Sequence, residues 1–311
     1  MTRRFLIDTD TGSDDAVALV MALRHPDIEV VGITTVAGNV PLQMATQNAL
    51  YTIEQCGRSI SVPVYAGCAK PMLREIVTAQ NVHGLDGMGD MGLPLHSRQP
   101  AAGHAVPKLI ELIHQYANDI TLVTLGPLTN VALAVMLDPS IAKLVSRCVV
   151  MGGTSDNVGN MGLVGEYNVW ADPEAAHIVF DSGLPITMVG WDISRKYAVI
   201  APEDAAAIRA IDTPLAHFCL DINAVVNKFC LEETQLAGFD LPDPIAMAVA
   251  IDPTVVTQIY RRHVIVDLGE GHGRGQILID HHGQLNRSHK ADLVVEASRE
   301  KFIQMLHNAI R

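Results

Sequence analysis

Four aspartates fall within eight residues near the start of the chain; they are Asp8, Asp10, Asp14 and Asp15. The apolar run before them ends at Ile7, and the segment after them, Ala16–Leu23, is typical of a buried helix. Burying unpaired like charges is costly, so a positive group must lie among them. A hard divalent cation such as Ca²⁺ or Mg²⁺, which binds oxygen ligands, is the simplest candidate. The chain must therefore fold so that the carboxylates of this turn share one centre.

The composition indicates a globular protein. Of the 311 residues, 49% are hydrophobic and 18% are charged, so the chain can bury a sizeable core. The formal net charge of −12 argues against nucleic acid or an anionic membrane as a partner. The start has no apolar core of signal-peptide length, and no apolar stretch reaches transmembrane length. The five cysteines are scattered and odd in number, so we expect reduced thiols and a cytoplasmic protein.

Short β-branched runs alternate with helical segments through the first two-thirds of the chain. The expected strands are Arg4–Ile7, Glu29–Val36, Val64–Ala66, Thr121–Leu125, Arg147–Met151 and Ile186–Val189. The expected helices include Asp14–Arg24, Leu42–Cys56, His104–Tyr116, Leu128–Met136 and Pro173–Asp181. This alternation predicts an α/β fold with a single open, mostly parallel, Rossmann-like sheet flanked by helices. Ligands bind such sheets at the carboxyl ends of the strands, where the polar segments of this chain fall.

No linker or low-complexity segment divides the chain, so residues 1–311 are expected to form a single domain. Beyond Pro253, the strand candidates His263–Leu268 and Gln276–Asp280 flank a glycine-rich turn. We expect them to form a small peripheral β addition near the C-terminus. A closing helix is expected at Lys301–Ile310.

The aspartate cluster can be interpreted in three ways. A solvated helix cap needs one or two acids, and four beside a buried strand exceed that need. A strand that ends in Asp-x-Asp also suggests the nucleophile loop of haloacid-dehalogenase-like phosphatases, in which the first Asp attacks phosphorus and Mg²⁺ balances the charge. That loop expects Thr or Val where Gly12 stands, and it has no place for Asp14 and Asp15. A metal site is therefore preferred, with the phosphatase as the weaker interpretation.

The segment Asp8–Ala16 closely resembles the N-terminal signature of the nucleoside hydrolases, the inosine-uridine-preferring family. Other segments resemble further motifs of this family, in the family's order: Thr34–Asn39, Val82–Gly87, Leu125–Asn130, Met151–Gly153, Glu166–Asn168 and Ala171–Ala176. The matches extend to about Pro253, and several motifs in order are more specific than any one of them. The resemblance implies an enzyme that hydrolyses the N-glycosidic bond of ribonucleosides to ribose and free base.

The resemblance also implies a Ca²⁺ site and a set of reacting residues. The metal ligands would be Asp10, Asp15, the backbone carbonyl of Leu125, and Asp243. Asp10 would also be the general base that deprotonates the attacking water. The substrate-binding residues would be Asp14, Asn39, Glu166 and Asn168 on sugar hydroxyls, Asn160 on the 5′-hydroxyl, and Met151 along the sugar pocket. Asp8 would orient the metal ligands from behind.

The chemistry of these residue types supports such roles independently. Cleavage of an N-glycosidic bond passes through a ribosyl cation-like state, and nearby carboxylates and amide oxygens stabilise the growing positive charge. A metal lowers the pKa of a bound water. A pocket rich in Asp, Asn and Glu can also give each sugar hydroxyl a partner once water has left.

The leaving group is where the chain departs from the family pattern. Many members carry His-Asp-Pro late in the chain, with that His thought to protonate the departing base, whereas Pro242 precedes Asp243 here. Another residue must supply the proton, or the base must leave without a dedicated acid. The candidate acids are His83, Glu232, Glu233 and Asp240, and the aromatic residues that could stack on a base are Phe229 and Phe239. We expect His83 to contact the base and the two phenylalanines to pack.

The expected protein is thus a calcium-dependent nucleoside hydrolase with Asp10 and His83 as its catalytic residues. The main alternative is a non-catalytic, metal-dependent riboside binder, because Pro242 removes the usual acid. We expect a small-molecule ribonucleoside as the partner, no nucleic acid and no membrane, and, from the resemblance, a homodimer or homotetramer. The base preference does not follow from the sequence. Trp170 and Trp191 are expected to pack in the core or at an interface.

Overall fold

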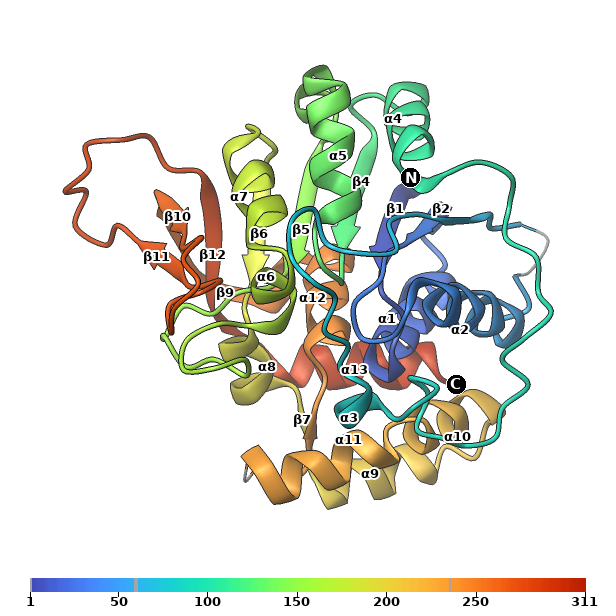
Figure 1. Cartoon of the computed structure of the whole chain (residues 1–311). Coiled ribbons are helices and arrows are strands. Elements are labelled where there is room, and N and C mark those ends of the chain that lie inside the picture. The colour runs from blue at the N-terminus through green and yellow to red at the C-terminus, as the bar shows by residue number, and fades with distance from the viewer. Residues whose placement is uncertain (1, 59–60, 235) are drawn as a thin grey trace.

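The computed structural model, which describes residues 2–58, 61–234 and 236–311, is built on an eight-stranded sheet (Figure 1). The strand order is β3-β2-β1-β4-β5-β6-β12-β9, and all neighbours run parallel except β9, which is antiparallel to β12. The strands are β1 (Arg3–Thr9), β2 (Ile28–Thr35), β3 (Val64–Ala66), β4 (Ile120–Thr124), β5 (Arg147–Met151), β6 (Ile186–Val189), β12 (Ala291–Ala297) and β9 (Val256–Arg262). Two small antiparallel pairs are β7 (Val199–Ile200) with β8 (Phe239–Asp240) and β10 (Val264–Val266) with β11 (Ile277–Ile279).

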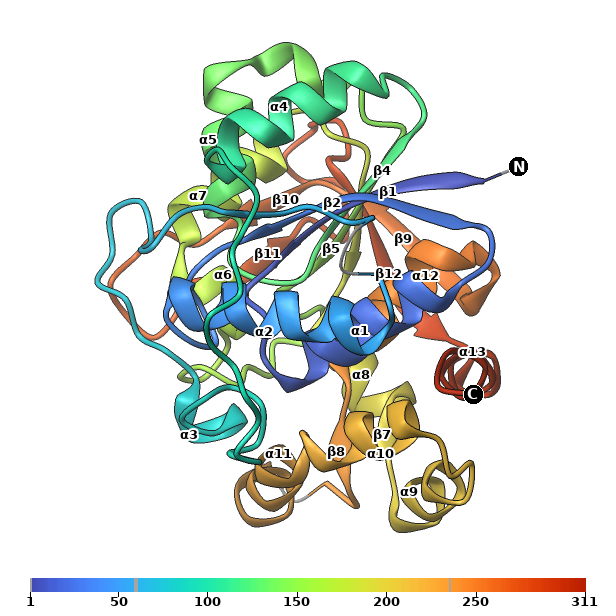
Figure 2. The same cartoon turned by 90° about the vertical axis from the view of Figure 1, so that its right-hand side faces the viewer.

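Helices cover both faces of the sheet, and a further group lies at the bottom of both ribbon views (Figures 1 and 2). One face is covered by α4 (Ala105–Gln115), α5 (Thr129–Leu137) and α7 (Pro173–Asp181). The other is covered by α1 (Ser13–Arg24), α2 (Leu42–Gln55), α8 (Trp191–Tyr197), α12 (Pro242–Ile251) and α13 (Arg299–Ala309). The bottom group is α3 (Gln80–His83), α9 (Pro202–Arg209), α10 (Pro214–Asp221) and α11 (Ala224–Phe229), which a π-helical turn at Cys230–Thr234 follows. The short α6 (Tyr167–Ala171) precedes α7, and 3-10 turns lie at Pro139–Lys143 and Pro253–Val255.

The first strand shows why the central strands are apolar without interruption. Side chains alternate between the two faces of a strand. Phe5 and Ile7 belong to the core beneath α1 and α12, whereas Leu6 belongs to the core beneath α4 and α5. Because helices cover both faces, every position of β1 from Phe5 onward is buried.

The topology creates a crevice at the end of β1. From β1 the chain builds β2 and β3 on one side of that strand, and then returns to build β4, β5 and β6 on the other side. The connections after β1 and β4 therefore diverge. Such a switch point is where open parallel sheets bind ligands, and the acidic turn lies there.

The predicted fold class is confirmed, and the expected strands and helices of the first two-thirds agree with the structure to within two residues at each end. The predicted peripheral β addition is present as the β10–β11 hairpin. The sequence prediction did not include β9 and β12, which extend the main sheet beyond β6. β9 is an exposed edge strand and β12 follows a long polar loop, so neither has the apolar surroundings that mark an interior strand.

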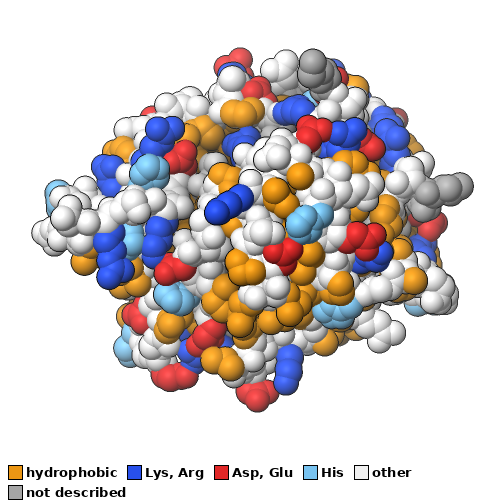
Figure 3. All heavy atoms as spheres, turned by 90° about the horizontal axis from the view of Figure 1, so that it is seen from above, with side chains coloured by type: hydrophobic (Ala, Val, Ile, Leu, Met, Phe, Trp, Pro, Cys, Tyr) orange, Lys and Arg blue, Asp and Glu red, His pale blue; other side chains and the backbone are white. Residues whose placement is uncertain are grey.

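Figure 3 views the molecule from above, onto the side of α4, α5 and α7. On this face Lys and Arg side chains are interspersed with acidic ones, and apolar side chains gather near the lower centre. Among the helices of the described residues, none is both long enough and apolar enough to cross a membrane.

The closing helix α13 contributes Phe302, which is fully buried in the core that contains α1 and α12. Replacing it by alanine leaves a cavity, so Phe302→Ala should lower the free energy of unfolding by about 3–5 kcal/mol. Urea unfolding followed by circular dichroism measures the change. Gln304→Ala, at an exposed position on the same helix, is the control and should change stability by less than about 0.5 kcal/mol. Equal effects of the two substitutions would contradict this packing.

Candidate active site

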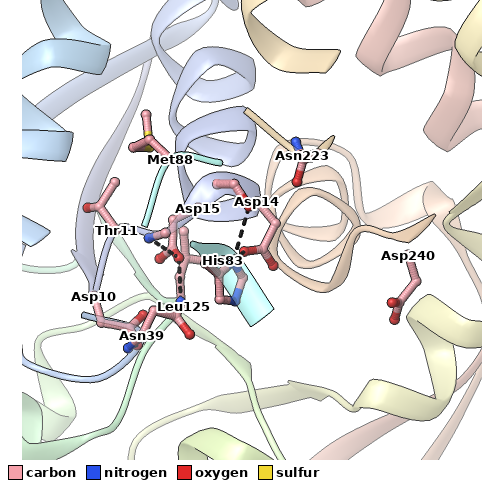
Figure 4. A network of polar contacts seen from close by, with 12 residues as sticks. Asp10, Thr11, Asp14, Asp15, Asn39, His83, Met88, Leu125, Asn223 and Asp240 are labelled. Atoms are coloured by element: carbon pink, nitrogen blue, oxygen red, sulfur yellow. Dashed lines mark hydrogen bonds and ion pairs between the residues drawn. The ribbon is translucent and has the colours of Figure 1, made fainter. Parts of the chain in front are cut away.

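Acidic residues from three elements converge at the carboxyl end of β1, and Figure 4 shows Asp10, Asp14 and Asp15 among them. Asp14 and Asp15 lie in the first turn of α1, and Asp243 lies in the first turn of α12. The two helices pack against each other, which brings Asp243 to the acidic turn. The free N–H groups and the dipole of each helix N-terminus favour negative charge there.

Asp8 is held by side chains from two neighbouring parts of the fold. Its Oδ1 accepts hydrogen bonds from Thr34 Oγ1 at 2.5 Å and from Asn130 Nδ2 at 2.8 Å. Asn130 also donates to the carbonyl of Thr35 at 2.9 Å and accepts from the Cys68 N–H at 2.9 Å. Burial raises the pKa of Asp8 to about 7. The sequence analysis gave Asn130 no role, although it closes one of the motifs noted there.

Asp10 and Asp15 are both fully buried and share a partner in Asn39. Asp10 Oδ2 accepts the backbone N–H of Asn39 at 2.6 Å, and Asp15 Oδ2 accepts from Asn39 Nδ2 at 2.9 Å. Asp15 also accepts from Thr9 Oγ1 at 2.5 Å and from the Gly12 N–H at 2.8 Å. Asn39, predicted to hold a sugar hydroxyl, therefore also fixes the distance between two carboxylates.

Two glycines leave the space that the Asp10 carboxylate occupies. A Cβ atom on Gly38 would lie 2.0 Å from Asp10 Oδ2, and one on Gly126 would lie 2.6 Å from Asp10 Oδ1. Either contact would force the carboxylate to move. The segments after β2 and β4 therefore require glycine where they flank Asp10.

The carboxylates fit a hard divalent cation. Oxygens of Asp14, Asp15 and Asp243 all lie within 4.8 Å of one another, and Asp10 is not a member of this set. One carboxylate oxygen each of Asp8, Asp10 and Asp14 is buried with no hydrogen-bond partner among the described residues. Burial and then repulsion between neighbouring acids raise the pKa of Asp10, Asp15 and Asp243. These buried oxygen atoms lack a compensating positive charge. Ca²⁺ and Mg²⁺ bind ligand sets of this kind.

Glu166 and Asn168 form the opposite side of the crevice. Glu166 caps α6: its Oε1 accepts the Asn168 N–H at 2.9 Å, and its Oε2 accepts the Gly153 N–H at 2.7 Å. Asn168 Nδ2 donates to the carbonyl of Leu125 at 2.7 Å and lies 3.2 Å from Met151 Sδ. These contacts tie α6 to the ends of β4 and β5. Burial raises the pKa of Glu166 to about 7.

Hydrogen bonds connect the loop between β5 and α6 to α8 and to the first residue of α6. Ser155 donates from its N–H and its hydroxyl to Asp192, at 3.0 and 2.7 Å. Asn160 is exposed midway along the loop, and its Oδ1 accepts the N–H of Tyr167, the first residue of α6, at 2.8 Å. The predicted ligand of the 5′-hydroxyl is thus placed beside α6.

The peripheral hairpin supports this loop from outside. Gln276 Nε2 donates to Asn157 Oδ1 at 3.0 Å, and Arg274 Nε donates to the Trp170 carbonyl at 3.0 Å. The Arg274 guanidinium carbon lies 4.0 Å from the centroid of the Trp170 ring. A Cβ on Gly275 would lie 2.6 Å from Trp170 Cα, so glycine allows the two backbones to approach. Trp170 is partly buried and packs at this junction between α6 and the hairpin.

His83 lies on α3 beside the acidic turn (Figure 4). Its Nδ1 is 3.0 Å from Ser13 Oγ and 3.6 Å from Asp14 Oδ1. Burial lowers the pKa of His83 to about 4, so the ring is neutral at pH 7. A neutral imidazole has one N–H donor and one acceptor nitrogen, which suits a hydrogen-bonding contact.

A cavity of about 640 Å³ joins these groups, a volume within the range of small-molecule sites. Nine of the sequence-predicted site residues line it: Asp14, Asn39, His83, Leu125, Met151, Asn160, Glu166, Asn168 and Asp243. The two others, Asp10 and Asp15, are buried at its edge through their bonds to Asn39. The predicted set is therefore gathered in one place.

The remaining wall carries residues whose roles the sequence left open: Trp191, Arg195, Phe229, Glu233, Asp240 and Pro242. Phe239 packs in the core as predicted, whereas Phe229 is half-buried against that core and also lines the cavity. Glu232 is exposed and does not line it. Trp191 is buried, but it belongs to the cavity wall as well as to the core, which the sequence analysis missed because a lone tryptophan carries no positional signal.

Asp240 is held as a hydrogen-bond acceptor. Its Oδ2 accepts from Trp191 Nε1 at 2.9 Å and from Ser194 Oγ at 2.7 Å. Its Oδ1 accepts from Cys230 Sγ at 3.6 Å. These three donors hold the Asp240 carboxyl group against the indole ring of Trp191. Burial raises the pKa of Asp240 above its ordinary value.

The fold and the site define an α/β enzyme that receives a small polar molecule over a carboxylate-rich turn at a topological switch point. The sequence profile of the inosine-uridine preferring nucleoside hydrolases matches residues 5–304. The chain belongs to this family, whose members are nucleoside N-ribohydrolases. The phosphatase interpretation of the acidic turn is thereby removed.

Known proteins resemble the chain over its whole length. It is 38% identical to the inosine-uridine preferring nucleoside hydrolase of Leishmania major over 312 residues, which cover 100% of this chain and 98% of the other. It is 34% identical to the pyrimidine-specific ribonucleoside hydrolase RihA of Salmonella typhimurium, covering 98% and 97%. The solved structure of the plant nucleoside hydrolase PpNRh1 matches with a TM-score of 0.94 at 30% identity, covering 100% and 99%.

The pKa values of the buried acids predict how the stability of the metal-free protein depends on pH. Burial raises the pKa of Asp8 and Glu166 to about 7 from 3.8 and 4.5. The folded state then binds their protons more tightly than the unfolded state, so stability should fall as pH rises from about 4 to about 7. Urea unfolding in EDTA at several pH values measures this, and Glu166→Gln should make the decline shallower. Stability that rises across this interval would contradict the assignment.

Proposed function

We propose that the chain catalyses the calcium-dependent hydrolysis of ribonucleosides to ribose and free base. The observation that carries this proposal is a set of buried carboxylates beside a nucleoside-sized cavity, some of whose oxygens have no hydrogen-bond partner among the described residues. Family membership supports the reaction class. The relatives named above prefer inosine and uridine or pyrimidine nucleosides, so both kinds of base belong in the first assay.

Four groups are proposed to hold the cation: Asp10, Asp15, Asp243 and the Leu125 carbonyl. Asp15 and Asp243 already lie within 4.8 Å of each other, together with Asp14. When bound, the ion supplies positive charge that polarises a water and steadies two ribose hydroxyls. Carboxylate and carbonyl oxygens suit Ca²⁺, which accepts six to eight of them in flexible geometry.

Asp10 is proposed as the general base. Its Oδ2 is fixed by the Asn39 N–H, and its Oδ1 is buried without a hydrogen-bond partner in the described structure. That oxygen can accept a proton from water as the water oxygen forms its bond to C1′. The glycines on either side, Gly38 and Gly126, keep the carboxylate in place for this transfer.

The sugar is proposed to lie between Asp14 and Asn39 on one side and Glu166 and Asn168 on the other. All four line the cavity, and together they offer carboxylate and amide groups to the hydroxyls. Negative charge on Glu166 and Asp14 also stabilises the ribosyl cation-like state. At the ends of this site, Asn160 is proposed to take the 5′-hydroxyl and Met151 to pack along the ring.

His83 is proposed to contact the substrate as a neutral ring beside Asp14, because its pKa lies near 4. Pro242 lines the cavity but has no proton to give. The start of α12 therefore offers no histidine that could protonate the departing base. The products, a free base and ribose, can be reused in nucleoside salvage, and we propose that the enzyme acts in salvage. We further propose that it is cytoplasmic and forms a homodimer or homotetramer.

The experiment that tests the function is a panel of ribonucleosides incubated with the protein and CaCl₂, followed by an assay for reducing sugar. Release of ribose from at least one nucleoside is expected. A protein that binds ribose yet releases no sugar from any nucleoside would instead favour the non-catalytic riboside binder.

Asp10→Asn should abolish most activity because the amide cannot accept the proton. We expect kcat to fall by about 1,000-fold or more, within the range of general-base and electrostatic losses combined. Asp8→Asn is the matched control, since Asp8 lies behind the site and bonds to Thr34 and Asn130. Its loss should be much smaller. A larger loss at Asp8 than at Asp10 would reverse these roles.

Asp243→Asn should weaken Ca²⁺ binding because it removes one of the charged ligands. Isothermal titration calorimetry on metal-free protein should show at least about a tenfold rise in Kd, which corresponds to about 1.4 kcal/mol. Asp212→Asn, whose side chain is exposed and 3.2 Å from His217, is the control and should bind as the parent does. Unchanged binding in Asp243→Asn would exclude it as a ligand.

A further inference from the structure

Arg195 is the one lysine or arginine among the described residues that line the cavity. It lies on α8, with its guanidinium carbon 4.5 Å from the centroid of the Trp191 ring. Trp191 is in turn bonded to Asp240, two residues before Pro242. Arg195 therefore belongs to the same wall of the cavity as Pro242.

This part of the cavity wall follows a different strand from the groups that are proposed to hold the sugar. Glu166 and Asn168 are tied to the ends of β4 and β5, whereas α8 begins directly after β6, one strand further along the sheet. If the ribose occupies the acidic end, the base extends toward α8 and α11. This step rests on the proposed function.

The guanidinium has hydrogen-bond donors to spare. Its Nη2 donates to both oxygens of Asp156, at 2.9 and 2.8 Å. Its Nε is buried without a partner, and the described residues give Arg195 no other hydrogen bond. Asp156 thus holds one edge of the guanidinium and leaves its other N–H donors available.

We propose that Arg195 is a catalytic residue that stabilises the departing base as an anion. Water forms a bond to C1′ and gives a proton to Asp10, while the C1′–N bond breaks and its electron pair passes to the base nitrogen. Conjugation spreads that charge to a carbonyl oxygen of the base, to which Arg195 donates an N–H. The free base then takes a proton from solvent. Oriented positive charge of this kind stabilises a developing anion without transferring a proton.

The proposal defines a substrate class: ribonucleosides whose base carries a carbonyl oxygen conjugated to the glycosidic nitrogen. Inosine and uridine belong to this class, and adenosine does not. A guanidinium matches such an oxygen because it presents several N–H donors in a plane. The ratio of kcat/KM for inosine to kcat/KM for adenosine should therefore decrease when Arg195 is replaced by alanine.

The test compares two leaving groups in Arg195→Ala and the parent enzyme with CaCl₂. With inosine or uridine, kcat/KM should fall by about 100- to 1,000-fold, the loss typical of one preorganised donor. With 4-nitrophenyl β-D-riboside, whose nitrophenolate leaves unaided, kcat/KM should change by less than about threefold. Arg195→Lys should recover part of the nucleoside activity, because it restores the charge without the fork geometry.

Two further variants separate this role from a structural one, since Arg195 also attaches the β5–α6 loop through Asp156. Asp156→Asn weakens that attachment but keeps the guanidinium and one acceptor oxygen for it. Its loss of nucleoside activity should therefore be about tenfold or less, well below that of Arg195→Ala. Lys196→Ala, at the next position of the helix and half exposed, is the matched control for loss of charge and should behave as the parent does.

Equal losses on the nucleoside and on the nitrophenyl riboside would overturn the proposal, because the residue would then act on folding or on the sugar. A selective loss in Asp156→Asn as large as in Arg195→Ala would also overturn it. If the parent enzyme cleaves neither substrate, the proposed function itself fails, and this inference fails with it.

Discussion

Repulsion among buried carboxylates is the constraint on which the rest of this structure depends. Burial raises the pKa of Asp10, Asp14, Asp15 and Asp243, and repulsion from neighbouring acids raises it further. For Asp14 the repelling acid is Asp240. Two helix N-termini and the amide of Asn39 stabilise part of this charge. Several oxygens nevertheless lack partners in the described structure. A divalent cation at this point would supply the missing positive charge, so the acidic turn and the proposed activity depend on the same residues.

The sheet topology explains how distant parts of the chain reach that point. The turn after β1 lies at the switch between two halves of the sheet, and α12 returns beside α1 to deliver Asp243. The wall made by α6 is held from inside by Asn168 and from outside by the β10–β11 hairpin through Arg274. The C-terminal region is thus part of the support of the site, even though it contributes no predicted ligand.

Much of the fold and of the site could be predicted from the sequence because short, local sequence patterns indicate these features. The interior strands are continuously apolar, and the acidic turn and later motifs are short segments that keep their order. The features that were missed depend on tertiary contacts. β9 and β12 join the sheet only because β6 offers an open edge, and Asn130 acts through its three bonds to separate segments. The places of Trp191 and Arg195 in the cavity wall likewise follow from packing of α8, which no local pattern encodes.

The most direct test of the central claim is a crystal structure of the protein grown with Ca²⁺ and free ribose, with the anomalous signal of the ion recorded. We predict one ion per chain between the acidic turn and α12, with oxygens of Asp15 and Asp243 in contact and ribose hydroxyls lying across it. An ordered acidic turn with no ion there, or ribose bound elsewhere with Asp243 turned away, would contradict the account.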